Sequence, residues 1–273
     1  MSDALRMRVF AGPNGSGKST MYEQVRSKKV NDRLVDLGVY VNPDEIAKRL
    51  RVDGSIDLKQ FKLTEGEKRF RTYAESSSLI NDRFPLKKAM GDCSWAGSVV
   101  RIDERAAADA YAQLLTQFIC DELLRTEQKF SFETVFSHRS KLEMMQRATK
   151  LGYKVYLYFI ATNDPEINKD RVKTRVAKRG HDVPTERIVS RYYRSLDLLV
   201  EAIQLSYHAF IFDNSGAIED LVMFAEYKVE PDRSANWVFL AKRIPDWFIE
   251  HYLQKEGSLE MFKAAHKARL LRE

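Results

Sequence analysis

The feature that most constrains this chain is a glycine-rich loop near its first residue. The loop occupies residues 12–20, with the sequence GPNGSGKST, and directly follows the short apolar run 7–11. Residues 21–26 favour a helix, so the loop joins a predicted strand to a predicted helix. In that context the glycines let the backbone curl, so that its N–H groups and the helix N-terminus face an anion. The pattern predicts a P-loop that binds a nucleoside triphosphate, against the alternative of a plain glycine turn.

Each part of the loop has an expected role. Lys18 is predicted to reach the β- and γ-phosphates, and the hydroxyl of Ser19 is predicted to hold Mg²⁺. The predicted nucleotide-binding residues of the loop are Gly12, Asn14, Gly15, Ser16, Gly17, Lys18, Ser19 and Thr20.

The amino-acid composition limits the classes of protein to which the chain can belong. The chain has 273 residues, of which 44% are hydrophobic and 31% are charged, as is typical of globular proteins. Its longest apolar run, 155–161, is too short to cross a bilayer, and no cleavable signal pattern precedes it, so no membrane association is expected. Cys93 and Cys120 lack metal-ligand or redox spacing and favour a cytoplasmic location. The net charge of +6 is spread along the chain, which disfavours nucleic acid as a partner.

Strand-like and helix-like segments alternate along the chain. Five β-rich segments are predicted, at residues 7–11, 38–42, 130–133, 154–161 and 209–213. This alternation predicts an α/β fold, a P-loop kinase-like parallel sheet of about five strands with helices on both faces. The interpretation adds a helical insertion at about 51–105 to a domain spanning 1–216. It also adds a small C-terminal extension, 217–273, packed on the core, with two strand-like segments and a helix at 258–271.

Ligands of such sheets bind at the carboxyl ends of the strands, so polar residues there are candidates. Asp44 follows the second strand, and a carboxylate beside the P-loop suits a base that accepts the proton of an attacking hydroxyl. Asp44 as a simple helix cap is the alternative. Glu133 and Thr134 close the third strand and are predicted to bind substrate. Asp213 ends the fifth strand, where it would either hold a metal, as a Walker-B aspartate does, or lie in a loop that contacts the base.

A basic segment is the second strong signal. Arg171, Arg175 and Arg179 share one face of a predicted helix, Gly180 and Pro184 interrupt it, and a second helix adds further arginines, Arg187, Arg191 and Arg194. This pattern matches the lid of a nucleotide kinase, where guanidinium groups bind the transferring phosphoryl group. A solvated basic face is the alternative.

Taken in order, these motifs resemble the zeta toxin family of P-loop kinases over residues 7–216. The resemblance rests on the P-loop, VNPDE at 41–45, FET at 132–134, Gly152-Tyr153, Arg175 with residues 180–184, Arg191-Tyr192 and FDNS at 212–215.

The resemblance implies an ATP-dependent kinase acting on the 3′-hydroxyl of UDP-N-acetylglucosamine. By motif, Lys18 and Ser19 would bind ATP and Mg²⁺, Asp44 would be the catalytic base, and Glu133 would lie on the substrate side. Arg175 would be the first phosphate-clamping arginine, with the second left open among Arg179, Arg187 and Arg191.

One position departs from the family pattern. Where the family has a glutamate for the nucleotide sugar, counting back from Glu133 gives Gln117, with Asp121 and Glu122 nearby. The resemblance also implies a separate antitoxin as a partner. Two other functions stay open: a P-loop kinase for another nucleotide, cofactor or antibiotic, and a nucleotide-dependent nucleic-acid-binding module.

Overall fold

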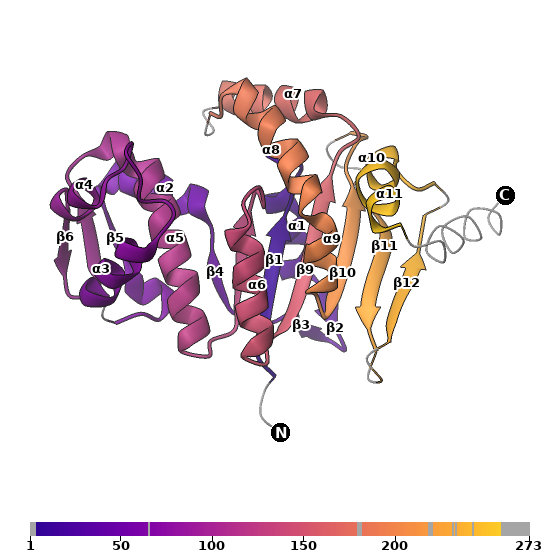
Figure 1. The fold of residues 1–273 in the computed structure, drawn as a ribbon, viewed down its shortest axis with the longest axis horizontal. Helices are drawn as coiled ribbons and strands as arrows, with labels where there is room; N and C mark the ends of the chain where they lie inside the picture. Colours follow the sequence, from indigo (N-terminus) through magenta and orange to yellow (C-terminus); the bar gives the residue numbers. More distant parts are fainter. Residues whose placement is uncertain are drawn as a thin grey trace. The chain divides into compact units, whose positions relative to one another are not determined.

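The computed structural model describes residues 4–64, 66–178, 182–217, 221–230, 232, 234–241 and 243–257. The chain forms two compact units (Figure 1), each considered by itself below. The first contains Met1–Asp36 and Glu133–Glu273, and the second contains Leu37–Phe132.

The main sheet has seven strands in the order β12-β11-β10-β9-β1-β8-β4. Strand β1 (Arg6–Ala11) pairs in parallel with β9 (Lys154–Ala161), and β9 pairs in parallel with β10 (His208–Asp213). Strands β11 (Val222–Val229) and β12 (Ala235–Phe239) continue the sheet beyond β10 in antiparallel directions. The remaining elements described in the first unit are α1 (Lys18–Ser27), β2 (Lys29–Val30), β3 (Arg33–Leu34), α6 (Ser140–Lys150), α7 (Pro165–Ala177), α8 (Thr185–Asp197), α9 (Leu199–Gln204), α10 (Asp246–Phe248), a π-helical turn (Ile249–Leu253) and α11 (Gln254–Glu256).

Helices cover both faces of these strands, as expected. Successive side chains of a strand point to opposite faces. On one face Phe10 stacks on Tyr158 and meets Tyr22 of α1 edge-on. On the other face Phe159, the next residue along β9, packs against Trp247 of α10. A strand covered on both sides needs apolar side chains on both, which explains the nearly continuous apolar run of β9.

Helices α7 and α8 form a basic hairpin, the predicted lid. A small apolar cluster joins them, made by Val172 of α7, Val183 in the connection and Ile188 of α8, with Val176 packed against it. Helix α7 begins where Asp164 accepts a hydrogen bond from the backbone N–H of Glu166, with Pro165 in the first helical position.

The second unit contains a three-stranded antiparallel sheet in the order β5-β7-β6. The region predicted as a helical insertion contains the helices α3 (Glu67–Ser76) and α4 (Leu86–Gly91), and it also contains strands of only three or four residues that were not predicted. Such short strands carry too little period-2 pattern to be recognised. The elements of this unit are β4 (Val39–Val41), α2 (Pro43–Asp53), β5 (Ser55–Asp57), a 3₁₀ turn (Leu58–Phe61), α3 (Glu67–Ser76), α4 (Leu86–Gly91), β6 (Cys93–Ala96), β7 (Val99–Ile102), a 3₁₀ turn (Arg105–Ala107), α5 (Ala108–Arg125) and the start of β8 (Phe130–Thr134).

The predicted α/β class with a largely parallel sheet is confirmed, but the sheet has seven strands rather than five. All five predicted segments are strands, and β11 and β12 of the C-terminal part supply the other two. The division at residue 216 stays a prediction, and the helix expected at 258–271 lies outside the described residues. Within the described part of the chain, no helix is both long and apolar enough to cross a membrane.

Candidate functional site

The P-loop connects β1 to α1 through three glycines with left-handed backbone. Gly12, Gly15 and Gly17 have φ of 143°, 75° and 103°, a region that side chains with a Cβ avoid. Gly17 is the N-cap residue of α1, and the helix begins at Lys18. The first backbone N–H groups of α1 therefore open toward the loop, where they can bind an anion.

Each of these glycines also lies against another segment of the first unit. A Cβ on Gly12 would collide with the carbonyl oxygen of Ile160 in β9. A Cβ on Gly15 would lie 2.7 Å from the carbonyl oxygen of Asn168, and one on Gly17 would lie 2.6 Å from Nδ2 of Asn214. The loop thus needs glycine for two reasons, backbone conformation and lack of space.

The same two asparagines hold the loop by hydrogen bonds. Nδ2 of Asn168 donates to the carbonyl oxygen of Asn14 at 2.6 Å, and Nδ2 of Asn214 donates to that of Ser16 at 2.8 Å. Both asparagines are buried. These bonds fix two carbonyl oxygens of the loop, and the N–H of Ser16 donates within the loop to the carbonyl oxygen of Pro13 at 3.3 Å.

The sequence interpretation missed Asn168. A polar residue inside a basic helix is usually expected on the surface. However, Asn168 lies four residues before the buried Val172 and therefore on the same, buried face of α7. Its Oδ1 is bonded to the hydroxyl of Thr162. The carbonyl oxygen of Thr162 in turn accepts a hydrogen bond from the hydroxyl of Tyr192 in α8 at 2.6 Å.

Ser19 and Glu133 meet at the end of the loop. The hydroxyl of Ser19 donates to Oε2 of Glu133 at 3.0 Å, and Glu133 is only 6% exposed. A hydroxyl beside a carboxylate offers the hard oxygen ligands that Mg²⁺ prefers. Among the described residues no group of three or more His, Cys, Asp or Glu side chains is arranged to hold a metal. The chemistry of this pair fits a Mg²⁺ that would take the hydroxyl of Ser19 as a ligand.

The neighbouring Thr134 shapes the chain after β8. Its Oγ1 accepts a hydrogen bond from the backbone N–H of Phe136 at 3.0 Å, and Phe136 has φ of 58°. A bulky residue rarely adopts this conformation, and such strained backbone concentrates at functional sites. Lys18, in the first turn of α1, donates from Nζ to the carbonyl oxygen of Pro13 at 2.8 Å.

The predicted phosphate-clamping arginines lie on the hairpin of α7 and α8. Arg175 and Arg191 are half-buried, Arg187 is exposed, and Arg179 lies outside the described residues. Arg171 donates from Nη2 to the carbonyl oxygen of Gly216 at 2.8 Å, and burial lowers the pKa of its guanidinium, partly offset by Asp213.

The carboxylate of Asp213 is occupied within its own loop. Oδ1 accepts hydrogen bonds from the hydroxyl of Ser215 at 2.7 Å and from Nε1 of Trp247 at 2.9 Å. Oδ2 faces the backbone N–H of Ser215 at 3.3 Å. These contacts argue against the metal-binding alternative and give Asp213 a role in fixing its loop.

Two predicted residues belong to the second unit. Asp44 is exposed in the first turn of α2, where its N–H donates to Oδ1 of Asn42 at 2.9 Å. Asn42, not Asp44, is thus the helix cap, and the catalytic role of Asp44 stays a prediction. Gln117 of α5 is half-buried, and its Oε1 accepts a hydrogen bond from the hydroxyl of Tyr73 at 3.1 Å.

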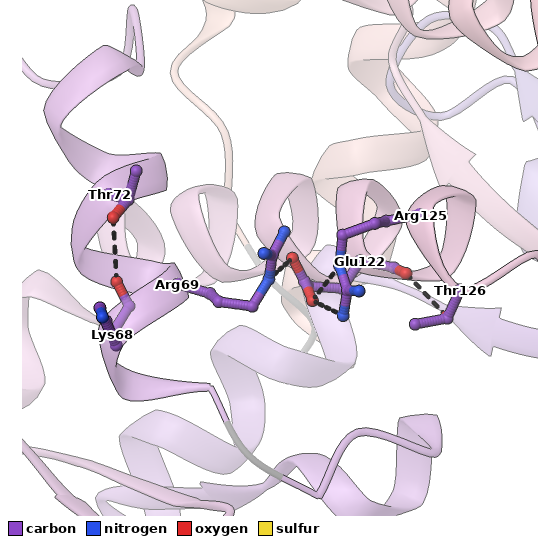
Figure 2. A network of polar contacts seen from close by, with 6 residues as sticks. All are labelled: Lys68, Arg69, Thr72, Glu122, Arg125 and Thr126. Carbon is purple, nitrogen blue, oxygen red and sulfur yellow. Dashed lines mark hydrogen bonds and ion pairs between the residues drawn. The ribbon is translucent and has the colours of Figure 1, made fainter.

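Glu122, near Gln117, is a buried carboxylate held by two arginines (Figure 2). Its Oε1 accepts a hydrogen bond from Nε of Arg69 at 2.6 Å, and its Oε2 accepts from Nε and Nη2 of Arg125 at 3.0 and 2.8 Å. These bonds join α3 to α5 and raise the pKa of Arg125. Glu122 is therefore engaged within the fold and does not replace the sugar-binding glutamate of the family pattern.

Residues 98–221 match the family model described as zeta toxin. This segment, which is somewhat less than half of the chain, is similar to the zeta toxin family. It contains Glu133, Thr134, Gln117, Arg175 and Arg191, whereas the P-loop and Asp44 precede it. The resemblance noted from the motifs is thus confirmed over the zeta toxin segment.

Individual proteins show more distant similarity. An uncharacterized protein of Haemophilus influenzae is 35% identical over 63 residues, which are 23% of this chain and 45% of that protein. A chain of the AvrRxo1-ORF1:-ORF2 complex with ATP is 14% identical, with a TM-score of 0.47, over 83% of this chain and 59% of its own. A chain of the PezAT toxin–antitoxin system of Streptococcus pneumoniae is 12% identical, with a TM-score of 0.44, over 98% of this chain and 86% of its own.

Proposed function

We propose that this protein is an ATP- and Mg²⁺-dependent kinase that phosphorylates a hydroxyl group of a small metabolite. The observation that carries the proposal is the P-loop. Its carbonyl oxygens are bonded by Asn168 and Asn214, and its Ser19 hydroxyl lies 3.0 Å from the buried carboxylate of Glu133. The match of residues 98–221 to the zeta toxin family model supports it.

Phosphoryl transfer needs groups that position the nucleotide and the acceptor and groups that stabilise the charge of the transferred phosphoryl group, and different residues of the chain would supply them. Backbone N–H groups of the loop and the ammonium of Lys18 bind the β- and γ-phosphates. Bound Mg²⁺ neutralises charge on the phosphates, and Ser19 is its protein ligand. Arg175, with Arg179, Arg187 or Arg191 as a second clamp, stabilises the negative charge that moves toward the acceptor, because guanidinium binds phosphate through two parallel hydrogen bonds.

On the acceptor side, Asp44 is the base that takes the proton of the attacking hydroxyl. Glu133, Thr134 and Gln117 bind the acceptor. The acceptor that follows from the family is UDP-N-acetylglucosamine, phosphorylated at the sugar 3′-hydroxyl. Gln117 offers an amide where a carboxylate is expected, so its contact with a sugar hydroxyl would be an uncharged hydrogen bond, weaker than a charged one.

The proposal also includes a partner. A zeta-type toxin is expected to be held in check by a separate antitoxin that covers the nucleotide site. Expression of the chain alone should then arrest growth, and Lys18→Ala should abolish that arrest. Growth unaffected by an active kinase would contradict the toxin role while leaving the kinase intact.

The deciding experiment measures ADP release from ATP and Mg²⁺ across a panel of nucleotide sugars and other hydroxylated metabolites. Release that depends on UDP-N-acetylglucosamine and disappears in both Lys18→Ala and Asp44→Asn would support the whole proposal. Lys28→Ala, a change of the residue just after α1, serves as a matched control and should retain activity. Release with a different acceptor would keep the kinase and replace the substrate, whereas no release with any acceptor would contradict it.

A further inference from the structure

Trp247 lies beyond the zeta toxin segment, in the short helix α10, and is 1% exposed. Its ring packs against Phe159 of β9, Phe224 of β11 and the adjacent Phe248, at centroid distances of 6.1, 5.7 and 5.6 Å. These contacts alone describe a core residue. A core role needs only an apolar ring and makes no use of the indole N–H.

The indole N–H has a defined partner at the carboxyl end of the sheet. Nε1 of Trp247 donates to Oδ1 of Asp213 at 2.9 Å, where the hydroxyl of Ser215 also donates. Oγ of Ser215 in turn accepts a hydrogen bond from the backbone N–H of Asn163 at 2.8 Å. The indole is therefore part of a network that ties the loop after β10 to the loop after β9.

Asn214 connects this network to the P-loop. Asn214, directly after Asp213, donates from its backbone N–H to the carbonyl oxygen of Ala161 at 2.9 Å. Its side chain donates to the carbonyl oxygen of Ser16 at 2.8 Å and lies where a Cβ on Gly17 would fall. A shift of Asp213 thus moves the group that orients the Ser16–Gly17 peptide, beside the first N–H groups of α1.

We propose that Trp247 is a positioning residue for the nucleotide-binding loop, acting through Asp213 and Asn214. The C-terminal part of the chain thereby contributes to nucleotide binding although it lies outside the zeta toxin segment. This inference rests on the proposed nucleotide-binding function for its functional consequence. Its structural link, from the indole N–H to the P-loop, does not depend on the reaction or on the acceptor.

The test compares Trp247→Phe with Phe248→Leu. The first removes the N–H donor and keeps an aromatic ring, while the second removes packing from the same buried aromatic cluster without changing a bond to Asp213. Two quantities are measured on the full chain: the affinity for a fluorescent ADP analogue, and hydrogen–deuterium exchange of peptides covering residues 12–20 in the absence of nucleotide. Thermal unfolding of both variants shows how much each loses in stability.

We expect Trp247→Phe to weaken analogue binding about fivefold, the equivalent of one net hydrogen bond, and to speed exchange in residues 12–20. Phe248→Leu should lower the unfolding midpoint at least as much and leave both other quantities at wild-type values. Asp213→Ala should weaken binding as Trp247→Phe does, and the double variant should be no weaker than the worse single variant if the indole acts through this carboxylate.

The opposite results would overturn the inference. Wild-type affinity and wild-type exchange in Trp247→Phe would make Trp247 a packing residue only, as would additive losses in the double variant. If the wild-type chain did not bind the analogue, the proposed function would fail, while the exchange measurement would still decide whether Trp247 holds the loop.

Discussion

Two buried glutamates show how differently the two units use a carboxylate. Glu133, at the end of β8, is bonded to the hydroxyl of Ser19 in the P-loop. Glu122, on α5, is bonded to the guanidinium groups of Arg69 and Arg125. Both glutamates are nearly inaccessible, at 6% and 2% exposure, so burial alone does not separate a functional carboxylate from a structural one.

The hydrogen-bond partners of Glu133 and Glu122 distinguish the two carboxylates. Two guanidinium groups carry the opposite charge at Glu122, and their charge-assisted bonds hold two helices together. Glu133 has the neutral hydroxyl of Ser19 as its partner in the P-loop, and this hydroxyl is itself a ligand that a metal can take over. The comparison teaches that a buried carboxylate bonded to an exchangeable hydroxyl, beside a phosphate-binding loop, is the better candidate for function.

The largest expected effect is on catalysis at Glu133. Glu133→Gln keeps the size of the side chain and an oxygen acceptor for Ser19 but removes the negative charge. We expect turnover to fall about 100-fold or more, as for the loss of one preorganised electrostatic contact, with the free energy of unfolding changed by less than about 1 kcal/mol. Steady-state ADP release measures the turnover, and thermal unfolding measures the change in stability. Full activity in Glu133→Gln would show that the charge of Glu133 is not needed for the reaction, and the contrast with Glu122 would no longer hold.

The next effect is on stability at Glu122. Glu122→Gln removes the charge that holds Arg69 and Arg125, whose side chains are about half exposed and can be rehydrated. We expect a loss of about 2 kcal/mol, less than for a fully buried pair, which lowers the unfolding midpoint by several degrees. Turnover per folded molecule should stay at the wild-type value. A turnover loss as large as that of Glu133→Gln would show that the network of Figure 2 serves the reaction as well.

A smaller effect separates the two arginines. Arg69 bonds Glu122 from another helix, 53 residues away, whereas Arg125 lies three residues along α5. We expect Arg69→Met to cost about 1 kcal/mol and Arg125→Met about half as much, because the second bond supports a helix that is already formed. Denaturant unfolding of both variants would measure the difference. Equal losses would mean that Arg69 does not contribute to joining α3 to α5.

The smallest effect concerns a third carboxylate, Glu226, whose Oε2 lies 3.2 Å from Nε2 of His208. Burial lowers the pKa of His208, and the bond to Glu226 opposes this only in part. The folded state therefore binds a proton at His208 less readily than the unfolded state does. The contribution of His208 to the free energy of unfolding is accordingly present above its ordinary pKa of about 6.5, and it is lost as pH falls below that value.

Accordingly, the unfolding midpoint should fall less between pH 7.5 and 5.5 in His208→Gln than in the wild type. His138→Gln, which changes an exposed histidine, should keep the wild-type dependence. A steeper fall in His208→Gln would mean that Glu226 stabilises the protonated form more than burial opposes it.

The sequence predicted the elements of the fold better than their assembly. The apolar runs of β1, β9 and β10 and the P-loop between β1 and α1 are local signals, and the three strands begin and end within one residue of the predicted bounds. The strand-like pattern of β11 does not say which strand it pairs with, so its antiparallel addition to β10 could not be read. At the site, motifs indicated the loop, but its bonds to Asn168 and Asn214 depend on contacts across more than 150 residues.

Those long sequence separations also bear on how the protein is made. The P-loop leaves the ribosome well before Ile160, Asn168 and Asn214, which enclose it. Contacts between residues far apart in sequence form late, after the intervening chain has been closed into a loop. A nascent chain that ends before residue 214 therefore carries the complete phosphate-binding motif without the groups that shape it. If the chain is a toxin, translation itself delays its activity until residue 214 has been made.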